Sequence, residues 1–128
     1  MGPSETFVAV VDDDESVARA IARLLRAAGI AVDTYTSGLA LLDKIAREPW
    51  YRPDCVILDV CMPEIGGLEI QRRLAPAALP VLFITAYDVP DVREKALSAG
   101  AIGYLRKPFS AGQLMDLMQS VKPWSGSP

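Results

Sequence analysis

Five polar side chains stand where they could act together as one site. Each follows a short apolar run, and the residues are Asp12, Asp13, Asp59, Thr85 and Lys107. Carboxylate and hydroxyl oxygens are hard ligands that suit Mg²⁺, with Mn²⁺ as a substitute. Three carboxylates in one site repel each other unless a proton or a cation neutralises them. A site neutralised by Mg²⁺ and a lysine can accept a phosphoryl group on a carboxylate.

The residue types that are missing exclude other chemistry. The 128 residues include no histidine, which excludes Ser-His-Asp triads, Cys-His pairs and histidine-ligated metals. Two cysteines alone make a poor zinc site, and we expect both to stay reduced. The formal net charge of −3 argues against direct nucleic-acid binding and against recruitment to anionic membranes. Without a recognisable signal peptide or a membrane-spanning run, we expect a cytoplasmic chain.

Short apolar runs alternate with helical patterns along the chain, which is typical of an α/β domain with a parallel sheet. The expected strands are 7–11, 30–35, 55–58, 80–84 and 103–106. The expected helices are about 17–28, 38–47, 68–74, 90–99 and 111–121. The second strand is the most polar, so we expect it at an edge, whereas the third is apolar throughout, as in a central strand. In the first helix, the apolar face is expected to comprise Val17, Ile21, Leu24, Leu25 and Ala28.

Five strands alternating with five helices fit a flavodoxin-like (βα)5 fold, a doubly wound parallel five-stranded sheet in the order 2-1-3-4-5. In that order the first and third strands are neighbours, and ligands bind beyond the carboxyl ends of the strands. The five polar residues named above then gather at one edge of the sheet. We expect one domain over residues 6–122, with an N-terminal extension over 1–5 and a flexible tail over 123–128.

Four segments together resemble the receiver domain of bacterial two-component response regulators, in a style close to the FixJ branch. They are VVDDDE, LDVCMPEIGG, FITAY and GYLRKPF, and the resemblance extends from Val8 to Val121. It implies a phosphorylation-operated signalling switch whose phosphoryl donor is a sensor histidine kinase or a phosphotransfer protein. It also implies a phosphoacceptor that assists its own phosphorylation and slow dephosphorylation, rather than an enzyme with an external substrate.

The resemblance also implies a role for each site residue. Asp59 is expected to be the phosphoacceptor. Asp12, Asp13 and the backbone carbonyl of Cys61 are expected to bind Mg²⁺ together with Asp59.

On the phosphate side, Thr85, Ala86 and Lys107 are expected to contact the phosphoryl group. Tyr104 is expected to act with Thr85 as an aromatic switch. The Lys107–Pro108 bond is expected to be cis. A homodimer through the fourth helix, fifth strand and fifth helix is a further expectation.

Two other classes of protein stay open as alternatives. A phosphatase of the haloacid dehalogenase type also uses an Asp nucleophile, but it usually needs a second acid two residues later, where this chain has Cys61. A phosphorylation-independent binding module, such as a flavin carrier, would need a hydroxyl-rich loop after the first strand, and this loop is acidic. A degenerate receiver, which is the other form of such a binding module, would normally have lost one of the five site residues, and all five are present.

Overall fold

A parallel sheet forms the centre of the computed structural model, which describes residues 6–86 and 89–119. Its strands are β1 (Phe7–Val11), β2 (Ala31–Tyr35), β3 (Cys55–Asp59), β4 (Val81–Thr85) and β5 (Gly103–Arg106). The order is β2-β1-β3-β4-β5, with every neighbouring pair parallel. The predicted flavodoxin-like strand order is therefore confirmed, and β1 lies beside β3.

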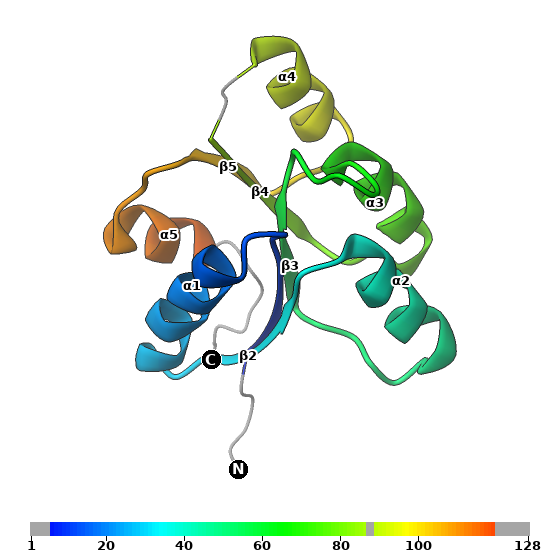
Figure 1. The fold of residues 1–128 in the computed structure, drawn as a ribbon, viewed down its shortest axis with the longest axis horizontal. Helices are drawn as coiled ribbons and strands as arrows, with labels where there is room; N and C mark the ends of the chain where they lie inside the picture. The colour runs from blue at the N-terminus through cyan, green and yellow to red at the C-terminus, as the bar shows by residue number, and fades with distance from the viewer. Residues whose placement is uncertain (1–5, 87–88, 120–128) are drawn as a thin grey trace.

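Helices cover both faces of this sheet (Figure 1). They are α1 (Glu15–Ala27), α2 (Gly38–Arg47), α3 (Gly67–Leu74), α4 (Pro90–Ser98) and α5 (Ala111–Met118), with a short 3-10 turn at Ala75–Ala77. On one face α1 and α5 pack together, and on the other face lie α2, α3 and α4. None of the helices within the described ranges combines the length and the apolar character needed to cross a membrane. The expected helical position of Val121 and the expected terminal segments 1–5 and 123–128 lie outside the described residues.

Strand burial follows the predicted difference between the centre and the edge of the sheet. Every residue of β3 and β4 is buried. In β2, at the sheet edge, Asp33 and Thr34 are exposed. A central strand is covered by helices on both faces, so a continuous apolar run is stable only there.

The first helix buries a stripe that agrees only in part with the expected one, because Ile21 and Leu25 are buried as predicted. Its buried residues are Ala18, Ile21, Ala22 and Leu25. Leu24 is 37% exposed and Ala28 is exposed, so the expectation was wrong at both positions. Positions three and four residues apart share a helix face, so Ala18, Ile21, Ala22 and Leu25 form one continuous buried stripe against the sheet.

The start of α3 packs tightly beneath the end of β3. A Cβ atom added at Gly67 would lie 2.8 Å from the backbone oxygen of Asp59 and 2.9 Å from Cε1 of Phe83. The backbone N–H of Gly67 also donates a 2.9 Å hydrogen bond to the carbonyl of Val60. The position therefore requires glycine because no space is left for a side chain.

Replacing Gly67 by Ala is expected to destabilise the protein by about 1–3 kcal/mol, because either the helix or the end of β3 must shift. Urea denaturation measures this change in unfolding free energy. Gly66→Ala is the matched control, since its added Cβ meets nothing closer than the Val60 oxygen at 3.9 Å. Equal stability of the two variants would contradict this explanation.

Candidate functional site

The carboxyl ends of four parallel strands lie along one border of the sheet, which forms its carboxyl edge. Asp12 directly follows β1, Asp59 ends β3, Thr85 ends β4 and Lys107 directly follows β5. The register aligns Asp59 with Ile84 across the β3–β4 pair, which keeps these ends level. The backbone N–H of Lys107 donates a 2.7 Å hydrogen bond to the carbonyl of Thr85. Residues that are far apart in the sequence are thus held together by the sheet.

A lysine bridges two buried carboxylates at this edge. Lys107 Nζ lies 2.8 Å from Asp12 Oδ2 and 3.6 Å from Asp59 Oδ2. Asp12 is fully buried, and Asp59 is only 7% exposed. Asp13 is exposed, yet its carboxylate belongs to the same cluster, because oxygens of Asp12, Asp13 and Asp59 all lie within 4.8 Å of one another.

Backbone donors fix the orientation of both buried carboxylates. The N–H of Asp14 donates to Asp12 Oδ1 at 2.9 Å, and the N–H of Cys61 donates to Asp59 Oδ1 at 3.2 Å. In each carboxylate the other oxygen, Oδ2, is the one near Lys107. The two carboxylates are therefore held alike: one oxygen accepts a hydrogen bond from a backbone N–H, and the other faces Lys107.

Burial and neighbouring charge act in opposite directions on these groups. Burial raises the pKa of Asp59, Lys107 lowers it and Asp12 raises it again, so the pKa lies above its ordinary value of 3.8. Burial lowers the pKa of Lys107, but the hydrogen bond with Asp12 and the charge of Asp59 outweigh burial, so the pKa is raised. Lys107 therefore stays charged at neutral pH, whereas burial destabilises the ionised form of Asp59.

The composition of the cluster suits a divalent cation. Three carboxylates and one ammonium leave the ionised cluster with a formal charge of −2. Its side-chain ligands are all oxygens, which Mg²⁺ and Mn²⁺ prefer. The acidic triad of Asp12, Asp13 and Asp59 is consistent with a site for such an ion.

The remaining predicted site residues lie around the cluster at different depths. Thr85 is fully buried at the end of β4, whereas Ala86 and Cys61 are exposed. Tyr104 lies within β5, where its ring is 6.4 Å from that of Phe83, so it packs against the apolar cluster on the face of the sheet that α2, α3 and α4 cover. The expected cis bond between Lys107 and Pro108 is confirmed.

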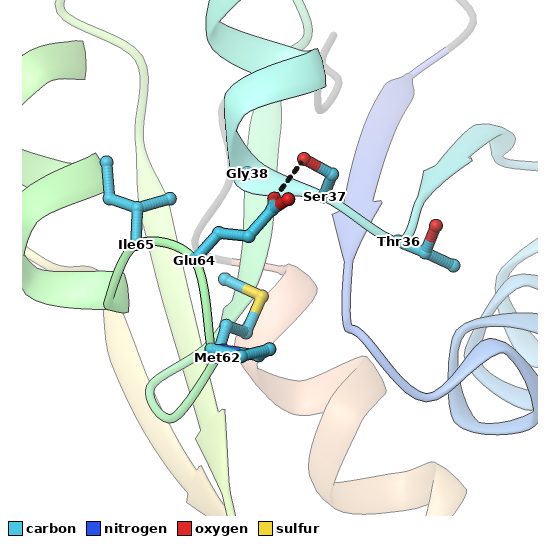
Figure 2. Close-up of a pocket in the computed structure, with 7 residues that line it drawn as sticks. Thr36, Ser37, Gly38, Met62, Glu64 and Ile65 are labelled. Carbon is cyan, nitrogen blue, oxygen red and sulfur yellow. Dashed lines mark hydrogen bonds between the residues drawn. The ribbon is translucent and has the colours of Figure 1, made fainter.

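Sequence reasoning missed one contact of the loop that follows Asp59. The loop after Asp59 borders a cavity of about 290 Å³, shown in Figure 2. In its lining, Ser37 Oγ donates a 2.9 Å hydrogen bond to Glu64. The two residues are 27 positions apart, and neither has a sequence signal that would identify the other. The cavity is lined by Thr36, Ser37, Gly38, Met62, Pro63, Glu64 and Ile65.

Comparison with known proteins identifies the family. Residues 8–119 match the response regulator receiver domain, so the chain belongs to that family. The structure is similar to that of a response regulator receiver protein from Burkholderia phymatum, at 60% identity and a TM-score of 0.83, covering 91% of this chain and 94% of that one. It is also similar to the crystal structure of FixJ-N, at 27% identity and a TM-score of 0.82, covering 93% of this chain and 94% of that one.

Longer proteins contain a similar segment. The response regulator protein TmoT of Ectopseudomonas mendocina is 36% identical over 122 residues, which is 94% of this chain and 54% of TmoT. The chain thus spans about half the length of that relative. The resemblance seen in the four sequence segments is therefore confirmed at the level of the family, including its FixJ-like neighbours.

The raised pKa of Asp59 predicts how stability depends on pH. In the folded state Asp59 binds its proton more tightly than in the unfolded state, so its ionisation at neutral pH destabilises the fold. Asp59→Asn removes that charge and can keep the Cys61 hydrogen bond. In the presence of a chelator, we expect it to stabilise the protein at pH 7 by ~1 kcal/mol.

Urea denaturation across a pH series tests this expectation. The gain should shrink as pH falls through the folded-state pKa and vanish below the unfolded-state value near 3.8. Asp116→Asn, at an exposed position of α5, serves as the control and should change stability by less than about 0.5 kcal/mol. A gain in stability that does not depend on pH, or a loss of stability at pH 7, would refute the claim that ionised Asp59 destabilises the fold.

Proposed function

We propose that this receiver domain accepts a phosphoryl group on Asp59 and relays that event by a change of conformation. The donor is a phosphohistidine on a sensor histidine kinase or on a phosphotransfer protein. In this proposal the reaction takes place in the cytoplasm. The observation that carries the proposal is the position of Lys107 Nζ, 2.8 Å from Asp12 and 3.6 Å from Asp59, beside a third carboxylate. The domain extends over residues 6–122 in this proposal.

The chemical step is a transfer between two nucleophiles. A carboxylate oxygen of Asp59 forms a bond to phosphorus while the bond from phosphorus to the donor imidazole nitrogen breaks, and the electron pair of that bond stays on the imidazole. The backbone of Cys61 holds Asp59 Oδ1, which leaves Oδ2 on the side of Lys107 as the attacking atom. Such a transfer depends mainly on position and on electrostatic stabilisation of the phosphoryl oxygens.

The acidic cluster provides the ligands for the metal ion that the proposed transfer requires. Asp12, Asp13, Asp59 and the backbone carbonyl of Cys61 would hold Mg²⁺, or Mn²⁺ in its place. The bound ion supplies positive charge for the phosphoryl oxygens, as metals do in other phosphoryl transfers. Because the Cys61 ligand is a backbone atom, the type of side chain at that position does not prevent binding.

The response to phosphorylation involves the neighbouring strand ends. Thr85, Ala86 and Lys107 would contact the phosphoryl oxygens, and these contacts favour one of two pre-existing conformations. Tyr104, on the strand next to Thr85, would report the change to the surface formed by α4, β5 and α5. We propose a homodimer or an output partner at that surface, which size-exclusion chromatography with and without a phosphoryl mimic tests. Unchanged elution and unchanged partner affinity would count against it.

The position of Cys61 disfavours phosphatase activity. A phosphatase that uses Asp59 would need a proton donor two residues later, and a thiol is poorly suited to this role. We therefore propose a phosphoacceptor that assists its own phosphorylation and slow dephosphorylation.

Acetyl phosphate with Mg²⁺ is expected to add one phosphoryl group to the wild type and none to Asp59→Asn. The reason is that the amide has no nucleophilic carboxylate oxygen. Intact-protein mass spectrometry measures the product, with Asp116→Asn as the control that should be labelled like the wild type. Equal labelling of wild type and Asp59→Asn would remove Asp59 from its role.

Lys107→Ala is expected to keep the fold but to lose the conformational response. It leaves the buried Asp12 carboxylate without the lysine at 2.8 Å, so stability at neutral pH should fall by about 1–3 kcal/mol. Amide NMR shifts of α4, β5 and α5 should move on phosphorylation in the wild type and much less in the variant. Lys44→Ala on α2 is the control, and an equal response in all three proteins would exclude Lys107 from switching.

A further inference from the structure

The loop between β3 and α3 carries the proposed carbonyl ligand, and hydrogen bonds anchor it at its base and near its tip. At its base the N–H of Gly67 donates to the carbonyl of Val60 at 2.9 Å. Near its tip, Glu64 accepts a 2.9 Å hydrogen bond from Ser37 Oγ. Cys61 lies between these two anchors. The two anchors therefore restrain the segment that carries its carbonyl.

The tip anchor lies at the border of a space that protein atoms do not fill. Figure 2 shows Glu64 extending from the loop toward Ser37 at the border of the cavity of about 290 Å³. Met62 and Ile65 of the same loop are only partly buried against the apolar cluster on the side of α2, α3 and α4. Close packing therefore restrains this loop less than it restrains the strands, and a single hydrogen bond can have a large effect on its position.

Helix α2 offers Glu64 a fixed and electrostatically favourable partner. Ser37 is the N-cap of α2, and its side chain also accepts the N–H of Ala40 at 3.3 Å. The first turn of α2 contains no acidic residue, so Glu64 places a negative charge near the positive end of the helix dipole from another element. Gly38 packs against Ile70 of α3, which leaves no room there for a side chain and fixes the start of the helix.

We propose that the hydrogen bond between Ser37 and Glu64 positions the carbonyl of Cys61 and thereby sets the Mg²⁺ affinity of the acidic cluster. Ser37 and Glu64 are then positioning residues, and neither contacts the metal. Groups that orient metal ligands without touching the ion commonly change affinity substantially when they are removed. This inference rests on the proposed function, since it requires the cluster to bind Mg²⁺.

Calorimetric titration of the full chain with Mg²⁺ tests the inference without phosphorylation. Glu64→Ala removes the acceptor, and Ser37→Gly removes the hydroxyl while keeping a residue that caps helices well. Each is expected to weaken Mg²⁺ binding by about threefold to tenfold, at the low end of effects at such positions because the contact is exposed. The double variant should be no weaker than Glu64→Ala alone, because both changes break one interaction.

Two controls separate positioning from charge and from unfolding. Glu64→Gln keeps an oxygen acceptor but loses the negative charge, so it should bind Mg²⁺ within about twofold of the wild type. Thr36→Ala removes a neighbouring hydroxyl from the same cavity wall and should bind like the wild type. Thermal denaturation of every variant confirms that the folded protein is titrated.

The possible outcomes distinguish this inference from the function on which it rests. Saturable binding by the wild type with unchanged binding by Glu64→Ala overturns the inference and leaves the proposed function intact. Glu64→Gln as weak as Glu64→Ala also overturns it, because charge would then explain the loss. A wild type without saturable Mg²⁺ binding overturns the proposed function and the inference together.

Discussion

The ion pair between Lys107 and the buried Asp12 organises the carboxyl edge of the sheet. The two residues are 95 positions apart, and their 2.8 Å contact exists only because β1 and β5 end at the same edge. A buried ion pair contributes little net stability, since desolvation offsets most of the attraction. Its effect here is positional, because it fixes the lysine beside Asp59 as well. A second buried acid next to the pair then leaves the edge with excess negative charge.

That excess charge connects the fold to the proposed signalling role. Asp59 is held by the backbone of Cys61 on one oxygen and faces Lys107 with the other, at 3.6 Å. The longer distance means that the lysine neutralises Asp12 more fully than Asp59. The cluster therefore favours whatever brings more positive charge to Asp59, or moves the lysine closer to new negative charge there. A divalent cation would bring such positive charge, and the proposed phosphoryl group would supply the new negative charge.

Much of this arrangement could be predicted from the sequence, for identifiable reasons. The apolar runs of β3 and β4, together with Asp59 and Thr85 at their ends, indicated both the central strands and the edge where the site lies. The stripe of α1 was less predictable, because Leu24 and Ala18 both satisfy helical spacing and only packing against the sheet selects the alanine. The contact between Ser37 and Glu64 has no local pattern, since it depends on how two loops meet in space. Likewise, spacing alone could not show that Lys107 pairs more closely with Asp12 than with Asp59.

A crystal grown with Mn²⁺ and measured for anomalous scattering tests the central claim most directly. We expect one strong anomalous peak at the carboxyl edge, in contact with oxygen atoms of Asp12, Asp13 and Asp59 and with the carbonyl oxygen of Cys61. Lys107 should still reach Asp12 in that crystal. A map with no peak at this edge, or with its peak at other acidic residues, would contradict the account.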